Sequence, residues 1–173
     1  MGFPEAREGN KPQAGADPGA VTGRVSDVAR IVEVGAKEVT EREAVAACVI
    51  SMTPQACRAL VAGTPKGNPI EASRVAGIMA VKRTPDLLPF CHPVAVTGAE
   101  VSVEPDEERG RIRIQATVRA HDRTGVEMEA LTASAVAALC LYDAAKAYDR
   151  AAVISELRLL SKRGGKSGDY RAP

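Results

Sequence analysis

The stretch RIRIQATVRAHDRTGVEMEALTASAVAALCLYDAAKAYDR, residues 111–150, contains two different hydrophobic periods in one continuous run. Apolar and polar side chains alternate over residues 111–119, which predicts a β-strand with one buried face. Over about residues 126–149 the apolar residues recur every three or four positions, which predicts a long helix. A strand and a long helix therefore follow each other directly, and the remaining elements must pack against this pair.

Two strands and two helices are predicted over residues 30–85, upstream of this stretch. Residues 30–52 indicate a short strand followed by a longer one near residues 42–52, and residues 53–63 a short helix. A second helix is predicted to begin at Asn68, a good N-cap that precedes a proline, and to end at Pro85. This helix is apolar nearly all round, so we expect it to be covered on two sides, by a sheet and by another subunit.

The order of the elements predicts the fold class. Residues 94–104 indicate a strand whose alternation slips at Gly98, as at a bulge or bend, and residues 151–162 a last strand. From residue 42 on, the order is β-α-β-β-α-β, with an extra short helix after the first strand. This order is the ferredoxin-like arrangement, an α+β fold in which helices pack on one face of an antiparallel sheet. The bare face of the sheet needs a cover, which oligomerisation usually supplies.

The composition indicates one domain in a reducing compartment. Residues 1–26 are rich in Gly, Pro, Ala and charge and are predicted to be a disordered tail, with the domain at residues 27–173. The net charge of +1 gives no general attraction to nucleic acid or to an anionic membrane. The four cysteines form no C-x-x-C pair. Without a signal peptide or a run of ~18 apolar residues, a soluble, cytoplasmic protein is expected.

The segment DLLPFCHPVAVTG, residues 86–98, places Cys91 and His92 between prolines. A metal site would need three or four ligands at workable spacing, and the chain has only two histidines. A thiol nucleophile with His92 as its base is disfavoured, because neighbouring side chains in an extended segment diverge. Two readings remain: an ordinary turn with one buried thiol, or a rigid loop that presents His92 to a ligand.

Charged residues stand near the end of the long helix. Lys146 lies in line with an apolar stripe of the helix, and Asp143 lies beside it, three positions earlier. The stripe consists of Met128, Leu131, Ala135, Ala138, Leu139 and Tyr142. An Asp–Lys pair at the rim of a pocket can exchange protons with a ligand, because each charge shifts the pKa of the other. The alternative is that Lys146 is only a cation favoured at a helix C-terminus.

The same helix begins with Glu127 and Glu129, where negative charge suits the helix dipole. Glu129 and Asp143 share one side of the helix but are separated by roughly 21 Å along its axis. One small ligand could hardly contact both residues in a single copy. If both serve one ligand, the site must be built by two subunits.

Cations are concentrated in three places: at Lys66, at Lys82 and Arg83, and in the segment SKRGGKSG, residues 161–168, which contains Lys162, Arg163 and Lys166. The segment is not a Walker A motif, because Leu160 stands where its first glycine would be and no helix can follow so near the terminus. Such a tail can still enclose an anion with backbone N–H groups and ammonium charges. The alternative is a frayed, solvated chain end.

Three strings of this sequence, KRTPDLLPFCHPVAVTGAEV, TGVEMEALTASAVAALCLYDAAKAYDR and GGKSGDY, resemble one known family. It is the cyclic pyranopterin monophosphate synthase family of molybdenum cofactor biosynthesis, the MoaC family, and the resemblance runs from about residue 28 to the end. It implies a ferredoxin-like fold, assembly as a hexamer (a trimer of dimers), and active sites at subunit interfaces. It also implies lyase activity on the GTP-derived 3′,8-cyclo-7,8-dihydro-GTP, with release of pyrophosphate.

The resemblance also implies roles for individual residues. Asp143, Lys146 and Lys66 are the catalytic residues that it implies. The implied substrate contacts are Phe90, Cys91, His92, Met128, Glu129, Arg42, Lys162 and Lys166. Phe90 stands where the family commonly has leucine. No residues are assigned to a metal and no cofactor is assigned with certainty; whether Mg²⁺ accompanies the triphosphate is left open.

Two other functions remain open from the sequence. A non-catalytic small-ligand-binding module could have the same fold, since ferredoxin-like domains support many binding functions. That function predicts that the Asp143–Lys146 pair is dispensable. A structural subunit without activity is a further alternative. Such a subunit is expected to have lost the cations matched above, but all of them are present here.

Overall fold

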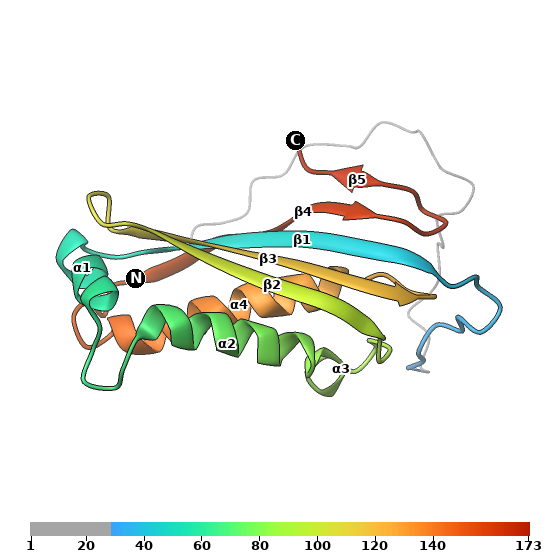
Figure 1. Cartoon of the computed structure of the whole chain (residues 1–173), viewed down its shortest axis with the longest axis horizontal. Helices are drawn as coiled ribbons and strands as arrows, with labels where there is room; N and C mark the ends of the chain where they lie inside the picture. The colour runs from blue at the N-terminus through green and yellow to red at the C-terminus, as the bar shows by residue number, and fades with distance from the viewer. Residues whose placement is uncertain (1–28) are drawn as a thin grey trace, which may run out of the picture. The chain divides into compact units, whose positions relative to one another are not determined.

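A computed structural model describes residues 29–173 of the chain (Figure 1), so the predicted disordered tail, residues 1–26, lies outside the described residues. Residues Ile31–Pro173 form one compact unit. The elements in chain order are β1 (Thr40–Ser51), α1 (Pro54–Ala62), α2 (Pro69–Val81), α3 (Thr84–Leu87), β2 (Val96–Asp106), β3 (Arg111–Asp122), α4 (Glu127–Ala145), β4 (Val153–Arg163) and β5 (Tyr170–Arg171).

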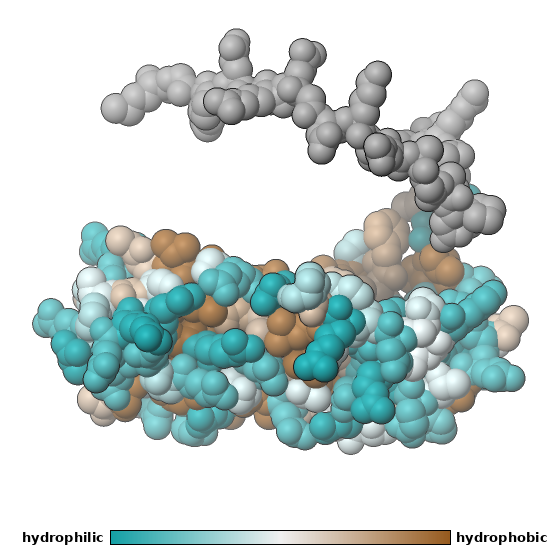
Figure 2. All heavy atoms as spheres, turned by 90° about the horizontal axis from the view of Figure 1, so that it is seen from above, coloured by the Kyte–Doolittle hydropathy of each residue, from teal (hydrophilic) through white to brown (hydrophobic). Residues whose placement is uncertain are grey.

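The strands form one antiparallel sheet in the order β2-β3-β1-β4-β5. Its first four strands have the order expected of the ferredoxin-like arrangement, and α2 and α4 lie side by side along one face (Figure 1). The predicted α+β fold class is therefore confirmed. On the face seen in Figure 2, the described residues are largely hydrophilic, and hydrophobic residues lie among them.

The alternation that predicted β3 is confirmed. Ile112, Ile114 and Val118 are fully buried beneath the helices, whereas Arg111 and Arg113 between them are exposed. The pairing of β2 with β3 shifts register between Val96 and Gly98, which confirms the predicted irregularity there.

The buried face of α4 differs from the apolar stripe that the sequence indicated. Of that stripe only Ala138 is fully buried, while Leu139 and Met128 are 57% and 40% exposed. The residues buried against the sheet and α2 are mostly small: Ala130, Ala133, Ser134, Ala137, Ala138, Leu141 and Ala145. The two helices pack so closely that a Cβ on Gly77 of α2 would lie 3.1 Å from the Ala133 carbonyl oxygen. Close packing therefore selects small side chains for the interior.

Helix α4 is also long and apolar enough to cross a membrane by length and composition alone. Its contacts with α2, β1, β3 and β4 instead make it the central helix of the core. Leu141 is fully buried in this core.

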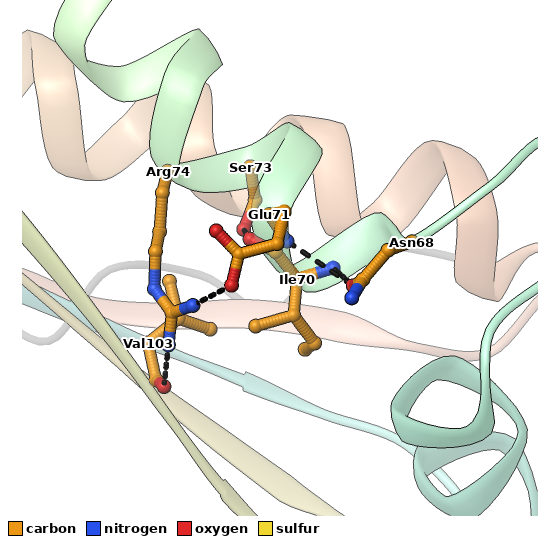
Figure 3. A network of polar contacts seen from close by, with 6 residues as sticks. All are labelled: Asn68, Ile70, Glu71, Ser73, Arg74 and Val103. Atoms are coloured by element: carbon orange, nitrogen blue, oxygen red, sulfur yellow. Dashed lines mark hydrogen bonds and ion pairs between the residues drawn. The ribbon is translucent and has the colours of Figure 1, made fainter.

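Helix α2 begins as predicted, and its first turns are tied to β2 (Figure 3). The Asn68 side chain accepts hydrogen bonds from the amides of Ile70 and Glu71 at 3.0 and 3.2 Å. Arg74 pairs with Glu71 and donates to the Val103 carbonyl of β2 at 3.3 Å (Figure 3). These contacts fix the loop that enters α2. Cover of α2 by another subunit remains a prediction.

Several predicted boundaries are wrong. Residues 29–39 form no strand, so the short strand predicted before β1 is absent from them. Pro85 lies in the first turn of the short helix α3, since proline is tolerated at a helix start. Helix α4 ends at Ala145 rather than near residue 149, and Lys146 caps it. The two-residue strand β5 was not predicted, because so short a strand has no period of its own.

Substituting Gly110 by alanine is expected to lower the free energy of unfolding by about 2–4 kcal/mol. Gly110 has a φ of +62°, and a Cβ there would lie 2.2 Å from the Met52 carbonyl oxygen. Chemical denaturation measures the effect. Gly98→Ala is the matched control, because a Cβ there meets only an Arg119 nitrogen at 4.0 Å. Equal stabilities of the two variants would contradict this account of the β2–β3 turn.

Candidate active site

Asp143, in the last turn of α4, stands between two lysines. Its Oδ1 lies 2.6 Å from Lys146 Nζ, and its Oδ2 lies 3.6 Å from Lys66 Nζ. Asp143 and Lys146 are neighbours because they lie three positions apart at the helix end. The structure therefore brings together the three residues for which the family resemblance implies a catalytic role.

A tight turn before α2 presents Lys66. The backbone amides of Thr64 and Gly67 each donate to the carbonyl of the other at 2.9 Å. The Thr64 hydroxyl also accepts a hydrogen bond from the Lys66 amide at 3.3 Å. The Asn68 cap follows at once, so the backbone on both sides of Lys66 is fixed. The side chain itself is 81% exposed and can move toward a ligand.

The two charges at the helix end shift each other's proton affinity. The hydrogen bond and charge of Lys146, with the charge of Lys66, lower the pKa of Asp143 below its ordinary value. The hydrogen bond to Asp143 correspondingly raises the pKa of Lys146. At neutral pH the pair is thus a carboxylate base beside an ammonium acid. Asp143 therefore becomes protonated at a lower pH than an ordinary aspartate, and Lys146 loses its proton at a higher pH than an ordinary lysine.

Lys146→Ala is expected to raise the pKa of Asp143 part of the way back to its ordinary value, because Lys66 still contributes its charge. NMR titration of the side-chain carboxyl carbon in acid measures this shift without requiring activity. Lys82→Ala, which removes an exposed lysine at the end of α2, is the control and should leave the titration unchanged. An unchanged titration in Lys146→Ala would contradict the close Asp143–Lys146 contact.

A cavity of about 690 Å³ adjoins the two lysines and Asp143. Its lining residues are Thr64, Pro65, Lys66, Tyr142, Asp143, Ala144, Lys146, Ala147, Tyr148 and Arg150. The cavity has the size and mixed lining of a small-molecule site.

A second group of charged residues lies near the start of α4. Lys162 at the end of β4 pairs with Glu127 at 3.3 Å and donates to the Ser167 hydroxyl at 2.6 Å. Arg42 of β1 donates to the carbonyls of Asp122 and Arg123 at 3.2 and 3.3 Å. Arg42 also lines a separate cavity of about 380 Å³. Lys166 lies exposed in the following loop.

The segment with Cys91 and His92 lies on this side of the molecule too. His92 lines a cavity of about 430 Å³ together with residues 31–35 and 122–124. Burial, and the charge of nearby Glu129, raise the pKa of the Cys91 thiol, which disfavours a thiolate nucleophile. Within residues 29–173, no three His, Cys, Asp or Glu side chains gather as a metal site.

The other predicted contacts near this segment differ in exposure. Phe90 is 59% exposed, whereas Glu129 is only 2% exposed at the start of α4. Burial raises the pKa of Glu129. Met128 beside it is 40% exposed, so in the single chain only the apolar member of this pair reaches the surface.

The predicted site residues thus fall into two groups at opposite ends of α4, a helix of 19 residues. The structure brings Lys66 and Lys146 to Asp143, but it does not bring His92 or Glu129 to them in one chain. The separation along the helix axis is roughly 21 Å, as the sequence indicated.

Sequence reasoning missed residues that the structure adds to both groups. Arg150 and Tyr148 line the cavity at Asp143, and Arg163 and Arg119 line the cavity at Arg42. Arg150 follows the predicted helix directly. A cation so close to Asp143 and Lys146 was the signal from which its place in the site could have been inferred. No local pattern indicated that Arg119 would lie beside Arg42.

Comparison with known proteins shows which family this chain resembles. The model of the MoaC family matches residues 31–165. A cyclic pyranopterin monophosphate synthase of Pelotomaculum thermopropionicum is 55% identical over 143 residues, which cover 82% of this chain and 84% of the relative. The synthase of Parvibaculum lavamentivorans is 50% identical over 83% of this chain and 91% of the relative. The synthase of a Roseiflexus species is 51% identical over 82% of this chain and 90% of the relative.

Proposed function

The chain belongs to the MoaC family, and we propose on that premise that it is a cyclic pyranopterin monophosphate synthase, a lyase of molybdenum cofactor biosynthesis. Its substrate is then 3′,8-cyclo-7,8-dihydro-GTP, which it rearranges to cyclic pyranopterin monophosphate with release of pyrophosphate. The observation that carries the proposal is the contact of Asp143 with Lys146 and Lys66 at the edge of a ligand-sized cavity.

The reaction requires proton transfer at several atoms of the purine-derived ring. Asp143 is ionised at neutral pH and can accept a proton, while Lys146 is protonated and can donate one. Lys66 stands on the other side of the same carboxylate, where it can transfer a proton or stabilise developing negative charge. Two ammonium groups and one carboxylate thus provide both directions of proton transfer.

Closing the cyclic phosphate forms a bond between a hydroxyl oxygen of the substrate and the α-phosphorus, and it breaks the bond between the α-phosphorus and the oxygen that leaves with pyrophosphate. The proton of the attacking hydroxyl passes to a base. The leaving group carries negative charge, which cations stabilise. Arg42 and Lys162 are proposed to bind the phosphates, with Lys166 in the adjacent loop. Mg²⁺ would enter as part of the triphosphate substrate, and no step is assigned to it. His92, with Phe90, Cys91, Met128 and Glu129, is proposed to orient the ring system.

The two groups of residues cannot serve one ligand within one chain, so the proposal includes an oligomer with sites between copies. Assembly as a hexamer, a trimer of dimers, is the form implied by the family resemblance. A cytoplasmic location is also proposed, and the four free cysteines suit a reducing compartment.

Incubation with GTP and a radical partner enzyme that makes the cyclised substrate tests the proposal. Chemical oxidation should then yield a fluorescent pterin only when this protein is present. Asp143→Asn is the matched negative control, because it preserves size and removes the base. A non-catalytic binding module would give no pterin with the wild-type protein or with Asp143→Asn. That outcome would overturn the proposed activity.

A further inference from the structure

The cavity around Asp143 has one wall that the proposed mechanism does not use. The turn between α4 and β4 forms it, and Tyr148 and Arg150 of this turn line the cavity. Tyr148 is 47% exposed, although the chain contains few aromatic residues. An exposed tyrosine beside an arginine in such a cavity suggests a contact surface for a ligand.

Hydrogen bonds hold this turn in place. Asp149 accepts a hydrogen bond from the Thr53 amide at 2.8 Å and another from the Ala151 amide at 2.9 Å. The amides of Tyr148 and Asp149 both donate to the Ala145 carbonyl at 2.8 Å. The arginine between Asp149 and Ala151 therefore has a fixed backbone, which reduces the entropy lost when its side chain binds a ligand.

The charges in the cavity favour an anion. Its lining residues include three cations, Lys66, Lys146 and Arg150, and one carboxylate, Asp143. Asp143 is already paired with the two lysines, whereas Arg150 makes no ion pair with any residue in the described part of the chain. Because the whole chain has a net charge of only +1, the cavity concentrates positive charge.

We propose that Arg150 binds a phosphate group of the nucleotide-derived ligand, while the aromatic face of Tyr148 contacts its ring system. A guanidinium group can donate two parallel hydrogen bonds to a phosphate. This planar set of donors suits a role in binding a phosphate. The inference rests on the proposed function and adds two substrate contacts to it.

Calorimetric titration of the full chain with GTP tests the role of Arg150. Arg150→Gln is expected to raise the Kd for GTP about tenfold, and Arg150→Lys to raise it less. Arg58→Gln is the matched control, since it removes an exposed arginine of α1 that lines no cavity described above. In the turnover assay, Arg150→Gln should raise the KM for the substrate by about the same factor as the Kd for GTP, and it should leave the pH profile of turnover unchanged.

Inorganic tripolyphosphate separates the two contacts, because it has phosphates but no ring. Arg150→Gln should weaken its binding, whereas Tyr148→Leu should weaken GTP binding several-fold and leave tripolyphosphate binding unchanged. Equal GTP affinities in Arg150→Gln and Arg58→Gln would overturn the role of Arg150. Weaker tripolyphosphate binding in Tyr148→Leu would overturn that of Tyr148. Either result leaves the pterin assay of the wild-type protein unaffected, so the two proposals can fail separately.

Discussion

Lys66→Ala and Lys146→Ala are each expected to reduce turnover by about 10²–10⁴-fold while the protein remains folded. The reason is the geometry around Asp143, whose two carboxylate oxygens lie 2.6 and 3.6 Å from the two ammonium nitrogens. Removing Lys146 removes the proton donor and also raises the pKa of the base. Removing Lys66 leaves that pair intact but removes the ammonium on the other side of the carboxylate.

The folded state should tolerate both substitutions, because the Lys66 side chain is 81% exposed and that of Lys146 is 54% exposed. Pterin yield per unit time is measured beside circular dichroism and thermal unfolding. Lys82→Ala, at the end of α2, is the control and should stay within about twofold of wild type. Turnover near the wild-type rate in either Lys66→Ala or Lys146→Ala would remove that lysine from the catalytic assignment.

Mixed oligomers of two inactive variants are expected to recover activity. If each site combines His92 of one copy with Lys146 of another, random mixing of His92→Ala and Lys146→Ala copies leaves about a quarter of the sites intact. Each variant alone has no intact site. The expected rise from near zero to about a quarter of wild-type turnover is large and follows directly from the separation along α4.

The two variants are co-expressed with different affinity tags and purified by both tags in succession, so that every oligomer contains both copies. The double variant carrying both substitutions, mixed with wild type, gives the reference for random assembly. If verified mixed oligomers stay inactive, each site is contained in a single copy, and the separation of the two groups needs another explanation.

Local signals in the sequence were sufficient for the features that depend on a few neighbouring residues. The alternation in β3 identified its buried face, and Asn68 before Pro69 located the start of α2. The Asp143–Lys146 contact is also local, since helical geometry places residues three apart side by side.

The interior face of α4 could not be predicted in this way. Hydrophobic patterns are dominated by large residues such as Leu139 and Met128, yet these are exposed in the single chain. The interior takes Ala133 and Ala137 instead, because α2 approaches α4 closely at Gly77. Alanine is only weakly apolar, so its spacing gave little signal.

Contacts between distant segments also escaped the sequence patterns. Lys66 lies far from Asp143 in the chain, and only the family resemblance, not spacing, indicated that both serve one site. Arg42 is held by the backbone carbonyls of Asp122 and Arg123, which no side-chain pattern encodes. The resemblance named residues, and the structure adds which of them share a cavity.

The cavity lining has a practical optical consequence. The chain has no tryptophan and three tyrosines, and two of these, Tyr142 and Tyr148, line the cavity at Asp143. The intrinsic ultraviolet fluorescence of the protein therefore originates largely beside this cavity. A molecule that enters there changes the surroundings of both emitting rings, so unlabelled protein can report its own occupancy in a fluorimeter.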